Sequence, residues 1–176
     1  ANYELKHIAD EECMFSSPQF TKDNDLILGG IAHIDASYGG SDGTAFTVLK
    51  QYEDKFVVFG MRWNKHVDDC LNIISNYMRI YKAGTIYCEK NADKGYLAKE
   101  LRNRGFIASD YQESMNKFIK ISTYLRQNWG NIIFLECTSP EYINEILDYT
   151  ENAPHDDSPD SLASILRQIT KGKWLY

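Results

Sequence analysis

Acidic residues stand at three places in this 176-residue chain where they could hold a divalent metal ion. Asp35 ends one apolar run, Glu89 ends another, and the aspartates Asp156, Asp157 and Asp160 lie together near the C-terminus. The four cysteines form no C-x-x-C pair and no histidines are paired, so zinc-ligand spacing is absent. A donor set made of oxygens alone suits Mg²⁺ or Mn²⁺.

Asp35 and Glu89 each have a simpler interpretation when taken alone. Asp35 leads into a segment of Ser, Gly and Asp residues, which are the usual constituents of a hairpin turn. Glu89 is equally typical of a polar residue that begins a loop. A carboxylate at the end of a stiff strand is nevertheless well placed to fix a metal ion or a reacting group. Whether Asp35 does so depends on the partners that the rest of the chain brings to it.

The aspartates near the C-terminus also allow two interpretations. Ser158 and Pro159 form a good helix entry, and acidic side chains near a helix N-terminus are stabilised by the helix dipole. However, three aspartates within residues 156–160 repel one another unless a cation lies between them. Asp157 and Asp160 are three residues apart and can share one helix face. A divalent ion is the natural candidate for the cation.

Two such ions about 4 Å apart can activate water and stabilise the leaving oxygen of a phosphodiester. This chemistry requires carboxylates from separate elements, and one of them must bridge the two ions. We expect Asp35 to be the bridge because it lies on the central strand.

The pattern of apolar residues predicts the elements that must position these side chains. Strands are expected where β-branched and aromatic residues gather, and helices where apolar residues recur at intervals of three and four. The predicted strands cover residues 26–36, 44–50, 55–62, 85–88, 131–135 and, less distinctly, 106–108. The predicted helices cover residues 67–82, 93–104, 113–128, 140–149 and 159–170. In the third helix, the inward residues are expected to be Met115, Phe118, Ile119, Ser122 and Leu125.

This order predicts an α/β fold: a mixed sheet, made of a three-stranded antiparallel meander plus parallel strands, flanked by helices. If the strands that end at Asp35 and Glu89 are neighbours, the two carboxylates converge at one sheet edge. We expect residues 1–25 to be an N-terminal arm or linker, residues 26–170 to be one domain, and residues 171–176 to be a loose tail. The chain begins at Ala1, so we expect a processed product or a piece of a longer protein.

Composition limits the classes of function. The net charge of −6 argues against a general polyanion binder, but it does not exclude a nuclease, whose acidic site is neutralised by bound cations. No apolar run of about 18 residues and no signal peptide occur, so we expect no membrane association. The P-loop pattern G-x-x-x-x-G-K-[ST] is also absent.

The arrangement resembles that of the RNase H-like (retroviral-integrase-like) nucleases, in which a strand-end Asp opens a meander, a later strand ends in Glu, and a final helix carries acids. Residues 34–45, Ile-Asp-Ala-Ser-Tyr-Gly-Gly-Ser-Asp-Gly-Thr-Ala, look like one motif of the C-terminal nuclease domain of the large terminase subunit of tailed bacteriophages. Residues 155–163, His-Asp-Asp-Ser-Pro-Asp-Ser-Leu-Ala, look like a second motif of that domain. The resemblance covers residues 27–170, and the two motifs together are more specific than either alone.

The resemblance implies an endonuclease that uses two Mg²⁺ or Mn²⁺ ions to cleave double-stranded, concatemeric viral DNA during genome packaging. Asp35, Glu89 and Asp157 match the catalytic positions, which bind metal. Further acids match accessory positions near the metals: Asp42, Asp156 and Asp160. The roles of Asp157 and Asp160 could be exchanged, since the start of the helix decides which of them faces the site.

The resemblance also implies partners. In full-length members, an N-terminal packaging ATPase, the small terminase subunit and the portal accompany the nuclease in the cytoplasm of the host cell. The absent P-loop fits a nuclease domain without its motor.

Basic residues suited to phosphate contacts complete the expected site. They are Arg62, Lys65, Lys90, Lys117 and Lys120. His155 could polarise water or simply cap the last helix, and His33, two residues before Asp35, could support the site or be a hydrogen-bonded core histidine.

Two other functions remain open. Another nuclease of the same fold, such as a Holliday-junction resolvase or an RNase H, would differ in its preference for branched DNA or RNA–DNA hybrids. A non-catalytic module that binds nucleic acid or the packaging machine would use the acids to hold a structural cation.

Overall fold

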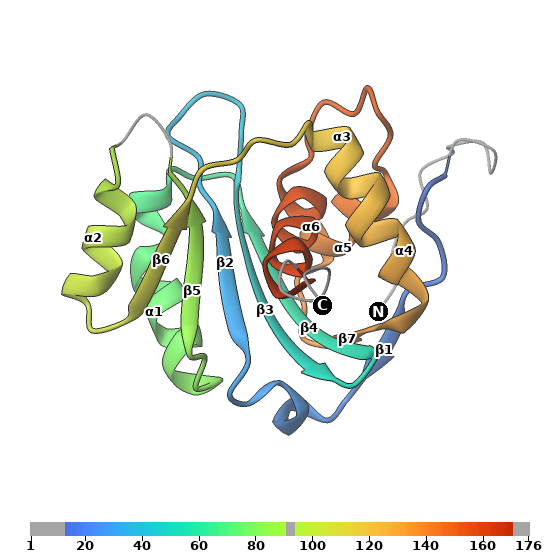
Figure 1. Cartoon of the computed structure of the whole chain (residues 1–176), viewed down its shortest axis with the longest axis horizontal. Coiled ribbons are helices and arrows are strands. Elements are labelled where there is room, and N and C mark those ends of the chain that lie inside the picture. The colour runs from blue at the N-terminus through green and yellow to red at the C-terminus, as the bar shows by residue number, and fades with distance from the viewer. Residues whose placement is uncertain (1–12, 91–93, 171–176) are drawn as a thin grey trace.

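The computed structural model describes residues 13–90 and 94–170. Its strands form one seven-stranded sheet in the order β1-β7-β4-β3-β2-β5-β6 (Figure 1). The strands are β1 (Gln19–Thr21), β2 (Ile31–Asp35), β3 (Thr44–Tyr52), β4 (Lys55–Trp63), β5 (Thr85–Glu89), β6 (Ile107–Tyr111) and β7 (Ile132–Leu135).

The sheet is mixed, as predicted. Strands β2, β3 and β4 form the antiparallel meander, and their hairpins keep sequential strands adjacent. The pairs β1–β7, β7–β4, β2–β5 and β5–β6 are parallel. The meander therefore lies in the middle of the sheet and places β2 beside β5.

Helices cover both faces of this sheet (Figure 1). The α-helices are α1 (Leu71–Ile80), α2 (Tyr96–Asn103), α3 (Lys117–Lys120), α4 (Arg126–Asn128), α5 (Pro140–Leu147) and α6 (Asp157–Thr170). Short 3-10 helices cover Asn24–Ile27, Val67–Asp69 and Trp129–Asn131, and a π-helix covers Ile121–Leu125 between α3 and α4. None of the helices in the described ranges has the length and apolar composition needed to cross a bilayer.

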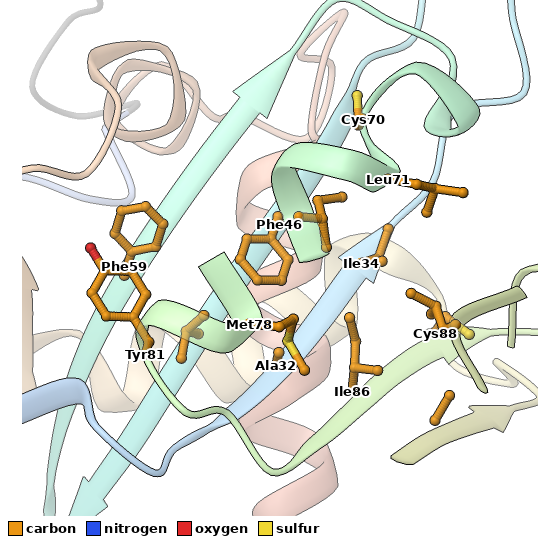
Figure 2. Close-up of a cluster of buried hydrophobic side chains, with 14 of the residues drawn as sticks. Ala32, Ile34, Phe46, Phe59, Cys70, Leu71, Met78, Tyr81, Ile86 and Cys88 are labelled. Carbon is orange, nitrogen blue, oxygen red and sulfur yellow. The ribbon is translucent and has the colours of Figure 1, made fainter. Parts of the chain in front are cut away.

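Two apolar clusters, one on each face, hold these layers together. Figure 2 shows the first, in which Phe46 of β3 and Ile86 of β5 pack under α1 and its Met78. The second cluster joins the other face to α5, α6 and the π-helix. The alternation along β3 divides its side chains between the clusters, since Phe46 and Val48 lie in the first and Leu49 in the second. Both faces are thus buried, which explains the nearly continuous apolar runs of the central strands.

The first predicted strand begins later than residue 26. Residues Asn24–Ile27 instead form a 3-10 helix, whose start is capped by Asp23 because its side chain accepts the Asp25 N–H. Gly29, with φ of +78°, then turns the chain into β2 at Ile31. Part of the expected arm also joins the fold, since Gln19–Thr21 pairs with β7 as an edge strand. Residues 171–176, the expected tail, lie outside the described residues.

The prediction for residues 113–128 was wrong about the start of the helix and about one of its inward residues. Asn116 caps the helix, so α3 starts at Lys117, and a π-helix follows. The wider turn of the π-helix shifts the buried face, so Ile119 is 54% exposed while Lys120 and Ile121 are buried. The residues of α3 that face α6 therefore include a lysine.

The predicted helix over residues 67–82 is divided into a 3-10 turn, Val67–Asp69, and α1. The last helix begins two residues earlier than predicted, at Asp157. This earlier start places both Asp157 and Asp160 in its first turn.

Candidate functional site

Asp35 and Glu89 lie at the same edge of the sheet. Strands β2 and β5 are parallel neighbours, and Ile34 pairs with Cys88 one residue before the two carboxylates. Because the carboxyl ends of parallel strands meet at one edge, Asp35 and Glu89 follow side by side. The neighbouring strands expected from the sequence are therefore confirmed.

Helix α6 brings the aspartate cluster to this edge. It packs across β2 and β3, and its first turn is buried, with Asp157 7% and Asp160 5% exposed. The charges of Asp160 and Asp157 both act on Asp35. Three carboxylates that are separated in sequence thus share one electrostatic environment.

Asp157 is oriented from the outer side of α6. Its Oδ2 accepts hydrogen bonds from the Gly43 N–H (3.0 Å) and from Arg62 Nη2 (3.3 Å). Burial raises the pKa of Asp157, while the Gly43 and Arg62 contacts partly oppose that rise. Arg62 also pairs with Glu145 of α5 and donates to Asn64.

Arg62 therefore lies between carboxylates and not on a DNA-facing surface. Its side chain is only 8% exposed, so a phosphate contact would require breaking its buried ion pairs. The sequence-based assignment of Arg62 to phosphate binding does not fit this geometry. Its contacts instead fix Asp157.

Lys120 is likewise turned inward, in contrast to its predicted contact with phosphate. It is 2% exposed and lies 2.7 Å from Asp160 Oδ1 and 2.8 Å from Glu113 Oε2. Arg167 of α6 pairs with the other oxygen of Glu113. Burial favours the neutral form of Glu113, but its hydrogen bonds from Lys120 and the Met115 N–H, together with the nearby cations, lower its pKa to about 2. Lys120 is thus a buried counterion that ties α3 to α6.

Lys117 lies between two of the aspartates. Its ammonium is 3.0 Å from Asp156 Oδ1 and 3.4 Å from Asp160 Oδ2, and its charge also acts on Asp35. The side chain is 46% exposed. The cation expected between the aspartates is therefore, in the protein itself, a lysine ammonium.

Asp35 has an oxygen without a partner. Its Oδ2 is shielded from solvent and accepts no hydrogen bond from the described residues. Burial, and then the charges of Asp160 and Asp157, raise the pKa of Asp35 well above its usual range. Burial also raises the pKa of Glu89. Such shifts are typical of carboxylates that are held together for a purpose other than stability.

His33 is a core histidine. It is 2% exposed, with Nδ1 2.9 Å from Ser161 Oγ and Nε2 2.7 Å from the Tyr111 hydroxyl. Burial and the charge of Lys120 lower its pKa to about 3, so the ring is neutral. Ser161 also contacts Thr47 Oγ1, which continues to the Tyr142 hydroxyl. This chain of hydrogen bonds anchors α6 to the sheet directly behind Asp35.

Tyr111 was not predicted as a site residue. Strand pairing places it opposite Glu89, and its pKa is raised by burial and by the charges of Asp160, Glu113 and Glu89. The only sequence signal was its position at the end of a short strand, and that strand was indistinct.

Four predicted site residues lie at the periphery. Asp42, Lys65, Lys90 and His155 are exposed. His155 borders a cavity of about 450 Å³ on the outer side of Arg62 and Glu145. Asp42 contributes only its charge to the environment of Asp157.

The donor set fits a divalent cation, although the side chains are not preformed around one. Within residues 13–90 and 94–170, no three His, Cys, Asp or Glu side chains are grouped as a metal site. Asp35 Oδ2 nevertheless offers a buried oxygen without a donor, and the nearby acids offer only oxygen ligands. The carboxylates are now held by lysines, so a metal must compete with these lysines for its ligands.

Comparisons with known proteins identify the fold. No family model and no curated protein sequence matches the chain. Among solved structures, the full-length large terminase of a thermophilic bacteriophage matches 89% of this chain with a TM-score of 0.61 at 13% identity. The large terminase nuclease of thermophilic phage G20c with bound magnesium matches 86% of this chain and 85% of its own, with a TM-score of 0.58 at 16% identity.

The match extends to a human virus. The manganese-soaked, inhibitor-bound terminase nuclease domain of human cytomegalovirus matches 90% of this chain and 91% of its own, with a TM-score of 0.59 at 12% identity. This chain has the fold of a large-terminase nuclease domain. It spans 44% of the first bacteriophage large terminase but most of the G20c and cytomegalovirus domains. The fold expected from the two motifs is confirmed, whereas identities this low do not carry activity from one protein to another.

Proposed function

We propose that this chain is a divalent-metal-dependent endonuclease domain that cleaves double-stranded DNA. The observation that carries the proposal is the convergence of Asp35, Glu89 and the first turn of α6 at one sheet edge, where Asp35 Oδ2 is buried without a partner. The terminase nuclease fold supports it, and so do the bound magnesium, zinc and cobalt of the G20c nuclease structures.

In this proposal, Asp35, Glu89 and Asp157 are the catalytic carboxylates that bind Mg²⁺ or Mn²⁺, with Asp160 and Asp156 beside them. The chemistry supplied by two bound ions would be activation of water and neutralisation of the departing oxygen of a phosphodiester. Strand β2 fixes Asp35, while Gly43 and Arg62 orient Asp157. Rigid placement of this kind is what positions a reacting group.

The proposed substrate is concatemeric viral DNA, cut during genome packaging in the host cell. Residues 26–170 would carry the nuclease, with residues 1–25 leading into it and residues 171–176 following. The matching bacteriophage large terminase has also been solved in complex with ADP and with ATP-gamma-S, so it includes a part that binds nucleotide, and for that part this chain has no P-loop. We therefore propose a packaging ATPase, a small subunit and a portal as its partners.

Nicking of supercoiled plasmid tests this function. With Mn²⁺ or Mg²⁺ we expect open-circular and then linear DNA, and EDTA should stop the reaction. Glu89→Gln should lower the rate about a hundredfold or more, because a neutral amide holds a cation poorly. The matched control Glu136→Gln, at an exposed site, should cut like the wild type.

Two outcomes would replace the proposal. Preference for a four-way junction or an RNA–DNA hybrid over linear duplex would indicate a different nuclease of this fold. Metal binding with no cleavage of any of these substrates would indicate a non-catalytic module with a structural cation.

A further inference from the structure

The acidic site contains two lysines whose surroundings differ. Lys120 is buried between Asp160 and Glu113 and is inaccessible to solvent. Lys117, one helical turn earlier, contacts Asp160 from the other side and is half exposed. The two lysines therefore hold the two oxygens of one carboxylate, Asp160, and only one of them has a path to water.

Removing either lysine from its partners has a different consequence. Displacement of Lys120 would leave the carboxylates of Asp160 and Glu113 without a counterion in a buried environment, which is strongly unfavourable. Displacement of Lys117 would return a flexible ammonium to solvent, which it already reaches. A half-exposed ion pair is weak because water competes for both charges.

The position of Lys117 matches the position of the proposed ion. Its ammonium acts on Asp160, Asp35 and Asp156, the acids that surround the partnerless Asp35 Oδ2. An ammonium and a divalent cation cannot both occupy the space between these oxygens. Any cation that binds Asp35 and Asp160 must therefore displace Lys117.

We propose that Lys117 is an exchangeable counterion: its ammonium holds the α6 carboxylates in the absence of metal, and a divalent cation displaces it from Asp160 on binding. This inference rests on the proposed function, since it takes the same acids as the metal site. It assigns the two lysines separate roles, with Lys120 as the permanent counterion and Lys117 as the one that leaves. The released ammonium would lie at the mouth of the site, where a DNA phosphate arrives.

Titration calorimetry with Mn²⁺, at one fixed pH and without DNA, tests the exchange. Lys117→Met keeps the apolar stem and removes the competing charge, so it should bind Mn²⁺ about tenfold more tightly than the wild type. Lys117→Arg keeps the charge and should bind within about threefold of the wild type. Lys99→Met, on the exposed face of α2, is the control for net charge and should leave the affinity unchanged.

A second measurement uses the wild-type protein and does not depend on how a variant folds. Acetylation by an amine-reactive ester, followed by mass spectrometry, reports how free each lysine is. Adding Mn²⁺ should raise the reactivity of Lys117 several-fold and leave Lys120 protected.

The outcomes separate this inference from the proposed function. If Asp35→Asn abolishes Mn²⁺ binding while Lys117→Met binds no more tightly and Lys117 reactivity does not change, the exchange is wrong and the metal site stands. If the wild type binds no Mn²⁺, or Asp35→Asn binds it equally well, both proposals fail. If Lys99→Met tightens binding as much as Lys117→Met, the effect is one of net charge and the exchange is rejected.

Discussion

Asp35→Asn is expected to abolish metal-dependent cleavage without lowering the stability of the metal-free fold. The rate should fall about a thousandfold or more, because Asp35 is the proposed bridging ligand and bound metal contributes several kcal/mol to catalysis. Most losses of a buried charge destabilise a protein, but here the charge has an oxygen without a partner and is repelled by Asp160 and Asp157. Replacing it with a neutral side chain of the same shape removes that repulsion.

Thermal unfolding measured with and without Mn²⁺ gives the second half of this result. Without metal, the Tm of Asp35→Asn should equal or exceed that of the wild type. With Mn²⁺, the wild type should gain stability by mass action and the variant should not. Asp54→Asn, in the exposed hairpin between β3 and β4, is the matched control and should retain both cleavage and the gain.

Wild-type cleavage by purified Asp35→Asn would remove Asp35 from the site. A large loss of stability without metal would instead show that Asp35 supports the fold. Either outcome would contradict the arrangement proposed for β2 and α6.

Lys120→Met should have the largest effect on stability of any substitution in the site. The side chain is 2% exposed, and its removal leaves Asp160 and one oxygen of Glu113 without their counterion. Breaking a buried pair by removing one partner costs about 3–5 kcal/mol, which in a domain of this size lowers Tm by roughly 10 °C. Urea unfolding, with a check that the slope is unchanged, measures the loss.

A double-mutant cycle identifies the cause of that loss. Adding Asp160→Asn to Lys120→Met removes the orphaned carboxylate, so part of the lost stability should return, with an interaction energy of about 1–3 kcal/mol. The control, Lys99→Met, should change stability by less than about 0.5 kcal/mol. A loss below about 1 kcal/mol in Lys120→Met would mean that Lys120 is not the counterion of these acids.

The sequence predicted the sheet edge well because its signals are local. The apolar runs before Asp35 and Glu89 indicated strands, and the meander followed from their spacing. Parallel pairing of β2 with β5 then brought the two carboxylates together without any further information. Strand β1 was missed because three residues are too few to show a pattern.

The basic residues could not be assigned from the sequence. A lysine is by default exposed, and nothing local to Lys120 indicates Glu113 or Asp160 as its partners. The π-helix after α3 rotates Lys120 inward and Ile119 outward, and regular helical spacing does not reveal such a rotation. Arg62 was misjudged for the same reason, because its carboxylate partners Glu145 and Asp157 lie on helices far along the chain.

The location of Mn²⁺ in crystals of the wild-type chain tests the central claim most directly, because anomalous scattering places the ion without reference to activity. We expect a peak bonded to Asp35, at about 2.1 Å from a carboxylate oxygen, with Glu89 or an aspartate of α6 as a further ligand. The ammonium of Lys117 should have moved away from Asp160. A fully occupied Mn²⁺ bound elsewhere, with Asp35 free of metal and Lys117 still on Asp160, would contradict the account.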